Sequence, residues 1–155
     1  MTELKITAKI QVYSYIELNE TQKKLVDMAR EATKNSYAPY SNFNVGAAIL
    51  LDNGVIIKGS NQENAAFAGT CAERSAIYNA GANYPGIGIQ MIAVTAFTRG
   101  SFVKEPCAPC GVCRQALLEF EKNASHPMKV LMAGEDTVYE AESITDLLPL
   151  CFKEF

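Results

Sequence analysis

Three of the five cysteines in this 155-residue chain follow one another at three-residue intervals, as Cys107, Cys110 and Cys113. Residues three apart lie on one face of a helix, and Pro109 suits a helix that begins just after it. Cys71 also stands where a polar loop enters a segment with helical spacing. Because a helix N-terminus stabilises a thiolate, two such helix starts can bring three sulfurs to one cation.

The expected zinc ligands are Cys71, Cys110 and Cys113, with one ion per chain. Zinc held by three protein ligands keeps a fourth position for water, which is the arrangement of catalytic sites. Glu73 follows Cys71 by two residues, so we expect its carboxylate to take a proton from that water and pass it to a leaving amine.

Charge balance gives two arginines a possible role at this site. Three thiolates outweigh the charge of one zinc ion and weaken its ability to acidify water. Arg74 is the expected charge-balancing residue, together with the two helix termini, and Arg114 is a lesser candidate.

The odd number of cysteines argues against a disulfide framework, and no charged head followed by an apolar run marks a secretion signal. We therefore expect a reducing, cytoplasmic location. No apolar stretch reaches the roughly 18 residues of a membrane span. The chain has 14 Lys and Arg against 17 Asp and Glu, a net charge of −3, which disfavours a nucleic-acid polymer as partner.

Hydrophobic patterns predict one layered α/β domain. Alternation from Leu4 to Val12 predicts an N-terminal strand, and Asn19 with Gln22 predicts a capping box for the first helix. Asn53-Gly54 predicts a hairpin. The further strands are expected at 45–51, 55–60, 87–97, 128–133 and 137–141, and the helices at about 20–34, 71–82, 110–120 and 144–148.

These motifs resemble those of the zinc-dependent cytidine deaminases, specifically the small homotetrameric type. The segments Cys71-Ala72-Glu73 and Pro109-Cys110-Gly111-Val112-Cys113 are similar to the three-cysteine form of the deaminase signature. The resemblance extends to residues 40–48, 61–64 and 147–149, and covers most of the chain. It implies a three-layer α/β/α sandwich with a mixed five-stranded sheet. Residues 1–18 would form an N-terminal extension with an extra strand, and residues 19–155 a single catalytic domain.

The resemblance also implies an activity: hydrolytic deamination of cytidine and 2′-deoxycytidine to uridine and 2′-deoxyuridine plus ammonia, in pyrimidine salvage. Water activated on zinc would attack C4 of the base, with Glu73 shuttling protons. The substrate is expected to be a free nucleoside, because an acidic surface repels a polymer of phosphates.

The same resemblance assigns five residues to substrate binding. Asn61 and Glu63 would bind the ribose hydroxyls, and Phe43 would pack on the base. The backbone N–H of Ala72 would position the attacking water or the pyrimidine carbonyl. Phe152 would reach into the pocket of a neighbouring subunit.

Four alternatives stay open from the residues. The zinc pair can be Cys107 with Cys110, which leaves Cys113 idle. All four cysteines can close a structural zinc site without a water position, as in a non-catalytic scaffold. Cys110 and Cys113 can form a redox pair. The substrate can be another cytosine nucleoside, as for blasticidin-type deaminases.

Overall fold

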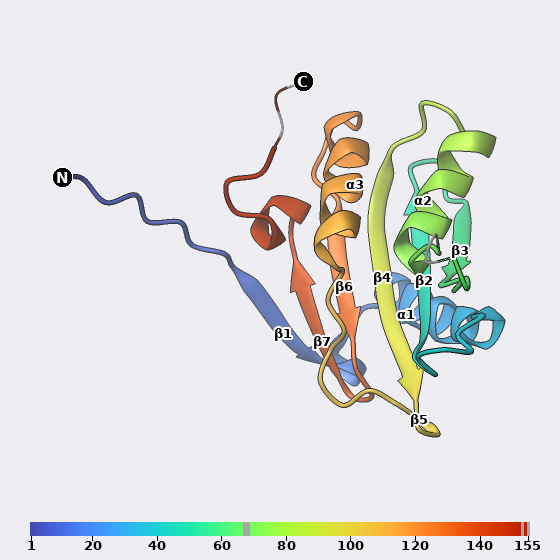
Figure 1. The fold of residues 1–155 in the computed structure, drawn as a ribbon. Coiled ribbons are helices and arrows are strands. Elements are labelled where there is room, and N and C mark those ends of the chain that lie inside the picture. The colour runs from blue at the N-terminus through green and yellow to red at the C-terminus, as the bar shows by residue number, and fades with distance from the viewer. Residues whose placement is uncertain (67–68, 153, 155) are drawn as a thin grey trace.

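A mixed sheet forms the middle of the molecule (Figure 1). The computed structural model describes residues 1–66, 69–152 and 154. The strand order is β1-β7-β6-β4-β2-β3, and a short β5 also pairs with β4. β4 and β6 are parallel, whereas the other neighbours are antiparallel. The strands are β1 (Ile10–Ser14), β2 (Asn44–Leu51), β3 (Ile56–Ser60), β4 (Ile89–Thr98), β5 (Ser101–Phe102), β6 (Lys129–Ala133) and β7 (Thr137–Ala141).

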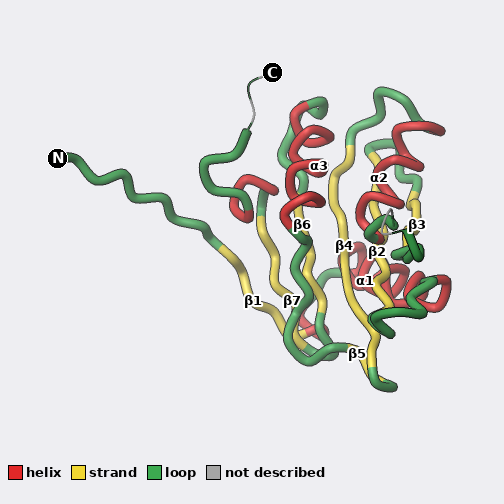
Figure 2. Tube along the Cα trace, viewed as in Figure 1, coloured by secondary structure: helices red, strands yellow, loops and turns green. Residues whose placement is uncertain are grey.

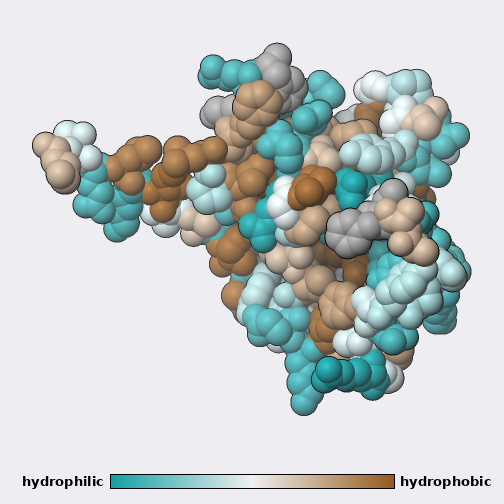
Figure 3. Space-filling model, viewed as in Figure 1, coloured by the Kyte–Doolittle hydropathy of each residue, from teal (hydrophilic) through white to brown (hydrophobic). Residues whose placement is uncertain are grey.

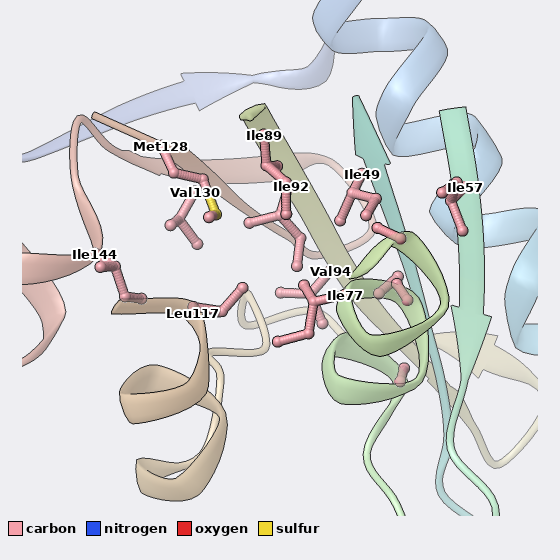
Figure 4. Close-up of a cluster of buried hydrophobic side chains, with 14 of the residues drawn as sticks. Ile49, Ile57, Ile77, Ile89, Ile92, Val94, Leu117, Met128, Val130 and Ile144 are labelled. Atoms are coloured by element: carbon pink, nitrogen blue, oxygen red, sulfur yellow. The ribbon is translucent and has the colours of Figure 1, made fainter. Parts of the chain in front are cut away.

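Helices cover both faces of this sheet (Figure 2). α1 (Glu20–Ala32) packs on one face through Leu25, Val26 and Ala29. α2 (Ala72–Asn83) and α3 (Gly111–Lys122) pack on the other, where Ile77 and Leu117 meet the strands (Figure 4). This arrangement confirms the predicted three-layer α/β/α sandwich with a mixed sheet.

The connections explain why α2 and α3 begin side by side. β3 and β4 are each antiparallel to β2, so they run parallel to each other, and α2 links them. α3 likewise links the parallel strands β4 and β6. Both crossovers, β3 to β4 and β4 to β6, move in the same direction across the sheet, and crossovers of one hand that do so place their helices on the same face. Both helix N-termini therefore point toward the same part of the molecule.

Gly59 in β3 allows α2 to approach the sheet closely. A Cβ at this position would lie 2.4 Å from the carbonyl oxygen of Ala72 and 2.6 Å from the backbone nitrogen of Ala76. These are backbone atoms of the first turns of α2, so a side chain here would push away the start of that helix.

The N-terminal strand is shorter than predicted, since β1 begins at Ile10 rather than at Leu4. Its partner β7 ends at Ala141, opposite Ile10, so the sheet offers no further residues to pair with. Residues 1–9 nevertheless continue outward in an extended path (Figure 1).

Four other elements differ from the predictions. The first helix ends at Ala32 and continues as a 3₁₀ turn, Thr33–Asn35, in which the Thr33 hydroxyl donates to the Arg30 carbonyl. The terminal helix is a 3₁₀ turn, Ile144–Leu147, and another 3₁₀ turn, Tyr15–Glu17, was not predicted. β5 was not predicted either. Within the part of the chain described, no helix combines the length and apolarity needed to cross a membrane.

Candidate active site

Three sulfurs meet where α2 and α3 begin. Cys71 is the N-cap residue of α2 and Cys110 that of α3, while Cys113 lies in the first turn of α3. The three Sγ atoms all lie within 4.8 Å of one another, and those of Cys71 and Cys110 are 3.9 Å apart. Cys113 is buried, whereas Cys110 is exposed and Cys71 is half-buried, so the cluster is open to solvent on one side.

This donor set fits zinc. Tetrahedral zinc binds thiolates at about 2.3 Å, which separates neighbouring sulfurs by about 3.8 Å. The 3.9 Å between Cys71 and Cys110 matches that value. Among the described residues, the group that gathers at this spacing does not include Cys107. The cluster thus has three sulfurs rather than four, and neither the closed four-sulfur site nor the pairing of Cys107 with Cys110 finds support in the geometry.

Glu73, which the sequence predicts to lie beside the zinc site, is buried. Glu73 lies in the first turn of α2, and only 4% of its surface is exposed. Burial raises the pKa of Glu73 to about 7, and the nearby charge of Cys71 acts in the same direction. Among the described residues, no other acidic side chain lies in the first turn of either helix.

The thiols and Arg74 form one electrostatic cluster. A hydrogen bond from Cys113 and, less strongly, one from Arg74 lower the pKa of Cys71 to about 5. Cys71 in turn, together with burial, raises the pKa of Cys113. Arg74 Nη2 donates to Cys71 Sγ at 3.7 Å, and this contact raises the pKa of the guanidinium. The arginine and the neighbouring thiol thus favour the thiolate form of Cys71, which is the form that binds a metal cation.

Cys107 and Arg114, two further candidates from the sequence, have other surroundings. Burial, followed by the charges of Glu73 and Cys71, raises the pKa of Cys107 to about 11, so this thiol stays protonated. Arg114 Nε donates to the Pro109 carbonyl at 2.8 Å, and its Nη1 donates to the Leu147 carbonyl at 2.6 Å. Arg114, the lesser charge-balancing candidate, thus ties the start of α3 to the C-terminal segment.

A surface hollow adjoins the sulfurs. Its volume is about 470 Å³, within the range of sites for small molecules, and its lining runs from Cys71 past Asn61 and Glu63 to Tyr40. The sequence reasoning did not single out Tyr40, although it opens the segment 40–48 in which the family resemblance was noted. The loop 61–70 closes one side of the hollow, and residues 67–68 of that loop lie outside the described residues.

Asn61 and Glu63 hold the loop that precedes β2. Asn61 Oδ1 accepts from the backbone N–H of Val45 at 2.8 Å, and its Nδ2 donates to the Phe43 carbonyl at 2.9 Å. Glu63 accepts from the backbone N–H of Tyr40 at 2.8 Å and from the N–H and hydroxyl of Ser41. Hydrogen bonding from the Ser41 hydroxyl lowers the pKa of Glu63. Both side chains line the hollow, and their hydrogen bonds also hold the loop before β2 in place.

The remaining residues assigned to substrate binding lie apart from this hollow or at its edge. Ala72 is buried at the first position of α2, next to Cys71. Phe43 is half-buried and is not among the lining residues. Phe152 is 67% exposed, and its carbonyl accepts from Gln115 Nε2 at 2.9 Å. Within one chain, the structure does not bring either phenylalanine into the hollow.

The sequence and the fold are similar to those of known proteins. Residues 19–126 match the family described as the cytidine and deoxycytidylate deaminase zinc-binding region. The chain is 38% identical over 133 residues to a cytidine deaminase of Sporosarcina psychrophila, covering 84% of this chain and 90% of the relative. It is 36% identical over 129 residues to a cytidine deaminase of Halalkalibacterium halodurans, covering 83% and 91%.

The fold is also similar to solved structures of cytidine deaminases. The crystal structure of cytidine deaminase from Burkholderia pseudomallei superposes with a TM-score of 0.69 at 38% identity, covering 87% of this chain and all of that one. The enzyme from Mycobacterium tuberculosis superposes with a TM-score of 0.69 at 29% identity, covering 88% of this chain and all of that one.

Proposed function

Because the chain belongs to the cytidine and deoxycytidylate deaminase family, we propose that it hydrolyses cytidine and 2′-deoxycytidine to uridine and 2′-deoxyuridine, releasing ammonia in pyrimidine salvage. The observation that carries this proposal is the three-sulfur cluster at two helix starts, with a buried carboxyl in the first turn of one of them. A site with three protein ligands leaves room for a reacting group, as a site with four does not.

Cys71, Cys110 and Cys113 would hold the zinc ion. When bound at such a site, zinc lowers the pKa of a water molecule and makes it nucleophilic near neutral pH. Glu73 would accept a proton on its carboxylate and return it to the amino group that leaves C4 of the cytosine ring. Burial of Glu73 shields this transfer from bulk water. Arg74 would offset the charge of the thiolates, since its guanidinium contacts Cys71.

The hollow beside the cluster would receive the nucleoside. We assign ribose binding to Asn61 and Glu63, which line it, and we assign to the Ala72 backbone N–H the positioning of water or of the pyrimidine carbonyl. Stacking on the base is assigned to Phe43, the last residue of the loop that Glu63 holds. Phe152 is assigned to the pocket of a neighbouring subunit, because it is exposed in the single chain.

Three broader assignments complete the proposal. Residues 19–155 would form the catalytic domain, and residues 1–18 an extension that precedes the family match. The chain would assemble as a homotetramer, which would give Phe152 a subunit to contact. It would act in the cytoplasm, where a reducing environment preserves its five free thiols.

Two measurements on the purified chain test the function. Zinc is quantified per chain, and ammonia and uridine are followed with cytidine, 2′-deoxycytidine and another cytosine nucleoside as substrates. Glu73→Gln should retain zinc and lose about 10²–10⁴ in rate, the usual contribution of positioned acid–base catalysis. Glu135→Gln, a change at an exposed residue of the β6–β7 hairpin, is the matched control and should keep the full rate. Zinc-loaded protein without turnover would contradict the proposal.

A further inference from the structure

The first nine residues form an extended arm that leaves the sheet at β1 (Figure 1). All nine are exposed, and residues 1–8 make no hydrogen bond or ion pair with the rest of the described chain. Apolar side chains nevertheless recur at every second position, and Leu4 is 74% exposed. Figure 3 shows apolar residues gathered along this arm. Such alternation is typical of a strand with one buried face, which the single chain does not provide.

An open sheet edge lies next to the arm. β1 pairs with β7 along one side, and along its other side no described strand pairs with it. Val12, in the middle of β1, is 64% exposed. Unpaired N–H and C=O groups at an edge are a template for a further strand. The edge and the arm thus each lack a partner.

The arm cannot occupy the edge of its own sheet. It runs directly into β1, and the stretch from Met1 to Tyr13 contains no Gly, Pro, Asn or Asp with which to reverse direction. An arm that adds to this edge must therefore belong to another copy of the chain.

We propose that the arm of a second copy of this chain adds antiparallel to the free edge of β1, with Ala8 facing Ala8 across a two-fold axis. The arrangement is reciprocal, because each arm covers the other copy's β1, as an isologous contact requires. It is additional to the deaminase activity and does not depend on the proposed tetramer.

Side-chain complementarity selects this register. With Ala8 on the axis, Leu4 faces Val12 of the second copy and Ile6 faces its Ile10. The exposed side chains of Leu4, Ile6 and Val12 and the half-buried Ile10 thus pair with one another. A shift that places Thr7 on the axis sets Lys5 against Lys9, and a shift that places Lys9 on the axis sets two lysines face to face. Like charges directly opposite each other destabilise a strand pair.

The charge of the surface beside β1 also favours the arm of a second copy in this register. Beside β1 lies a hollow of about 420 Å³ that includes the carboxylates of Glu140, Glu142 and Asp146 in its lining. Lys9 also lines this hollow and Lys129 contacts Glu140 and Glu142, so the three carboxylates outnumber the two lysines by one negative charge. In the proposed register, Lys5 of the second copy stands opposite Gln11, which also lines this hollow. The basic side chain would thus approach an acidic surface.

Site-directed cross-linking of the zinc-loaded full chain tests the register. Facing Cα atoms in an antiparallel pair are about 4.5–5.5 Å apart, which permits a disulfide. Ala8→Cys should therefore give a covalent dimer in an oxidised glutathione buffer, and mass spectrometry should identify a disulfide that joins position 8 of the two copies. In Ile6→Cys, the two new thiols would lie about 14 Å apart along the strands and should not join.

Two controls make the outcome decisive. The unaltered chain reports any dimer that arises from its native cysteines. Adding Leu4→Asp to Ala8→Cys places a charge against Val12 of the second copy and should abolish the cross-link. Circular dichroism should show that the fold is retained, because Leu4 is exposed within the single chain. Equal cross-linking of Ala8→Cys and Ile6→Cys, or none with either, would overturn the proposal.

Discussion

Cys71 and Cys110 hold equivalent positions in two different helices, each as the N-cap residue, and their sulfurs lie 3.9 Å apart. Helix N-caps are usually Ser, Thr, Asp or Asn, whose oxygen accepts a backbone N–H. Neither cysteine makes such a bond. The positive ends of both helix dipoles are thus directed at sulfur, which favours the thiolate form needed to bind a cation. Each helix therefore lacks the stabilisation of a side-chain cap, and the N-cap position holds a metal ligand instead.

The assignment of the zinc ligands predicts that substitutions of Cys113 and Cys107 differ in their effect on zinc content. Cys113→Ser should lower zinc to well under one ion per chain, because it removes one of the three gathered sulfurs. Cys107→Ser should leave zinc content unchanged, because that sulfur is outside the group. Metal analysis after gel filtration measures both. Loss of zinc in Cys107→Ser with retention in Cys113→Ser would reverse the assignment.

Arg74 is predicted to support metal binding through its charge. Its guanidinium donates to Cys71 Sγ at 3.7 Å and lowers the pKa of that thiol, so in Arg74→Gln protons should compete more strongly with zinc for the sulfur. Residues that contact metal ligands typically contribute about 10–100-fold to metal affinity, and a loss of that size is expected. Competition with a coloured chelator measures it. Arg74→Lys keeps the positive charge and should recover part of the affinity; equal weakening in both variants would contradict a charge effect.

Asn61 and Glu63 are predicted to differ in what they contribute to stability. Asn61→Ala removes the acceptor of the Val45 N–H and the donor to the Phe43 carbonyl, both part-buried. It should lower the free energy of unfolding by about 1–3 kcal/mol, the cost of leaving buried groups unpaired. Glu63→Gln keeps one acceptor oxygen for the loop, so the free energy of unfolding should change little. Because the carboxylate is assigned to ribose binding, its loss should raise KM for cytidine. Urea unfolding and steady-state kinetics separate the two effects.

His126 gives a prediction about pH. The Pro127 carbonyl and then the Asp52 carboxylate, 2.9 Å from Nε2, raise the pKa of His126 above its ordinary value of 6.5. The folded chain therefore binds this proton more tightly than the unfolded chain. The added stability is complete below pH 6.5 and is lost as the pH rises through the raised folded pKa.

His126→Gln should accordingly lower the free energy of unfolding more at about pH 5.5 than at about pH 9. The difference should stay below about 1 kcal/mol, because the pair is partly exposed to solvent. Urea unfolding of both proteins at the two pH values measures it. A larger destabilisation at the alkaline pH would contradict the assignment.

The sequence was informative where spacing along the chain decides the structure. Three-residue spacing placed Cys110 and Cys113 in one helical turn, and the side chains of Asn19 and Gln22 make the predicted reciprocal capping bonds. The Asn53-Gly54 hairpin also forms. In each case the interacting groups are close in sequence, so local rules suffice.

Contacts between distant segments were harder to predict. The hydrogen bonds of Asn61 to Val45 and Phe43 depend on how the loop before β2 packs against the end of β3, and no periodicity encodes that packing. The tie from Arg114 to the Leu147 carbonyl likewise depends on where the C-terminal segment lies. The alternation at residues 4–12 indicated strand propensity, but the length of β7 determines how much of it pairs within the chain.

X-ray absorption at the zinc edge of the purified chain tests the central claim most directly. We predict three sulfur neighbours at about 2.3 Å and one lighter oxygen neighbour at about 2.0 Å. The Cys107→Ser variant should give the same spectrum. Four sulfur neighbours that fall to three in Cys107→Ser would show a closed structural site, and would contradict the catalytic account.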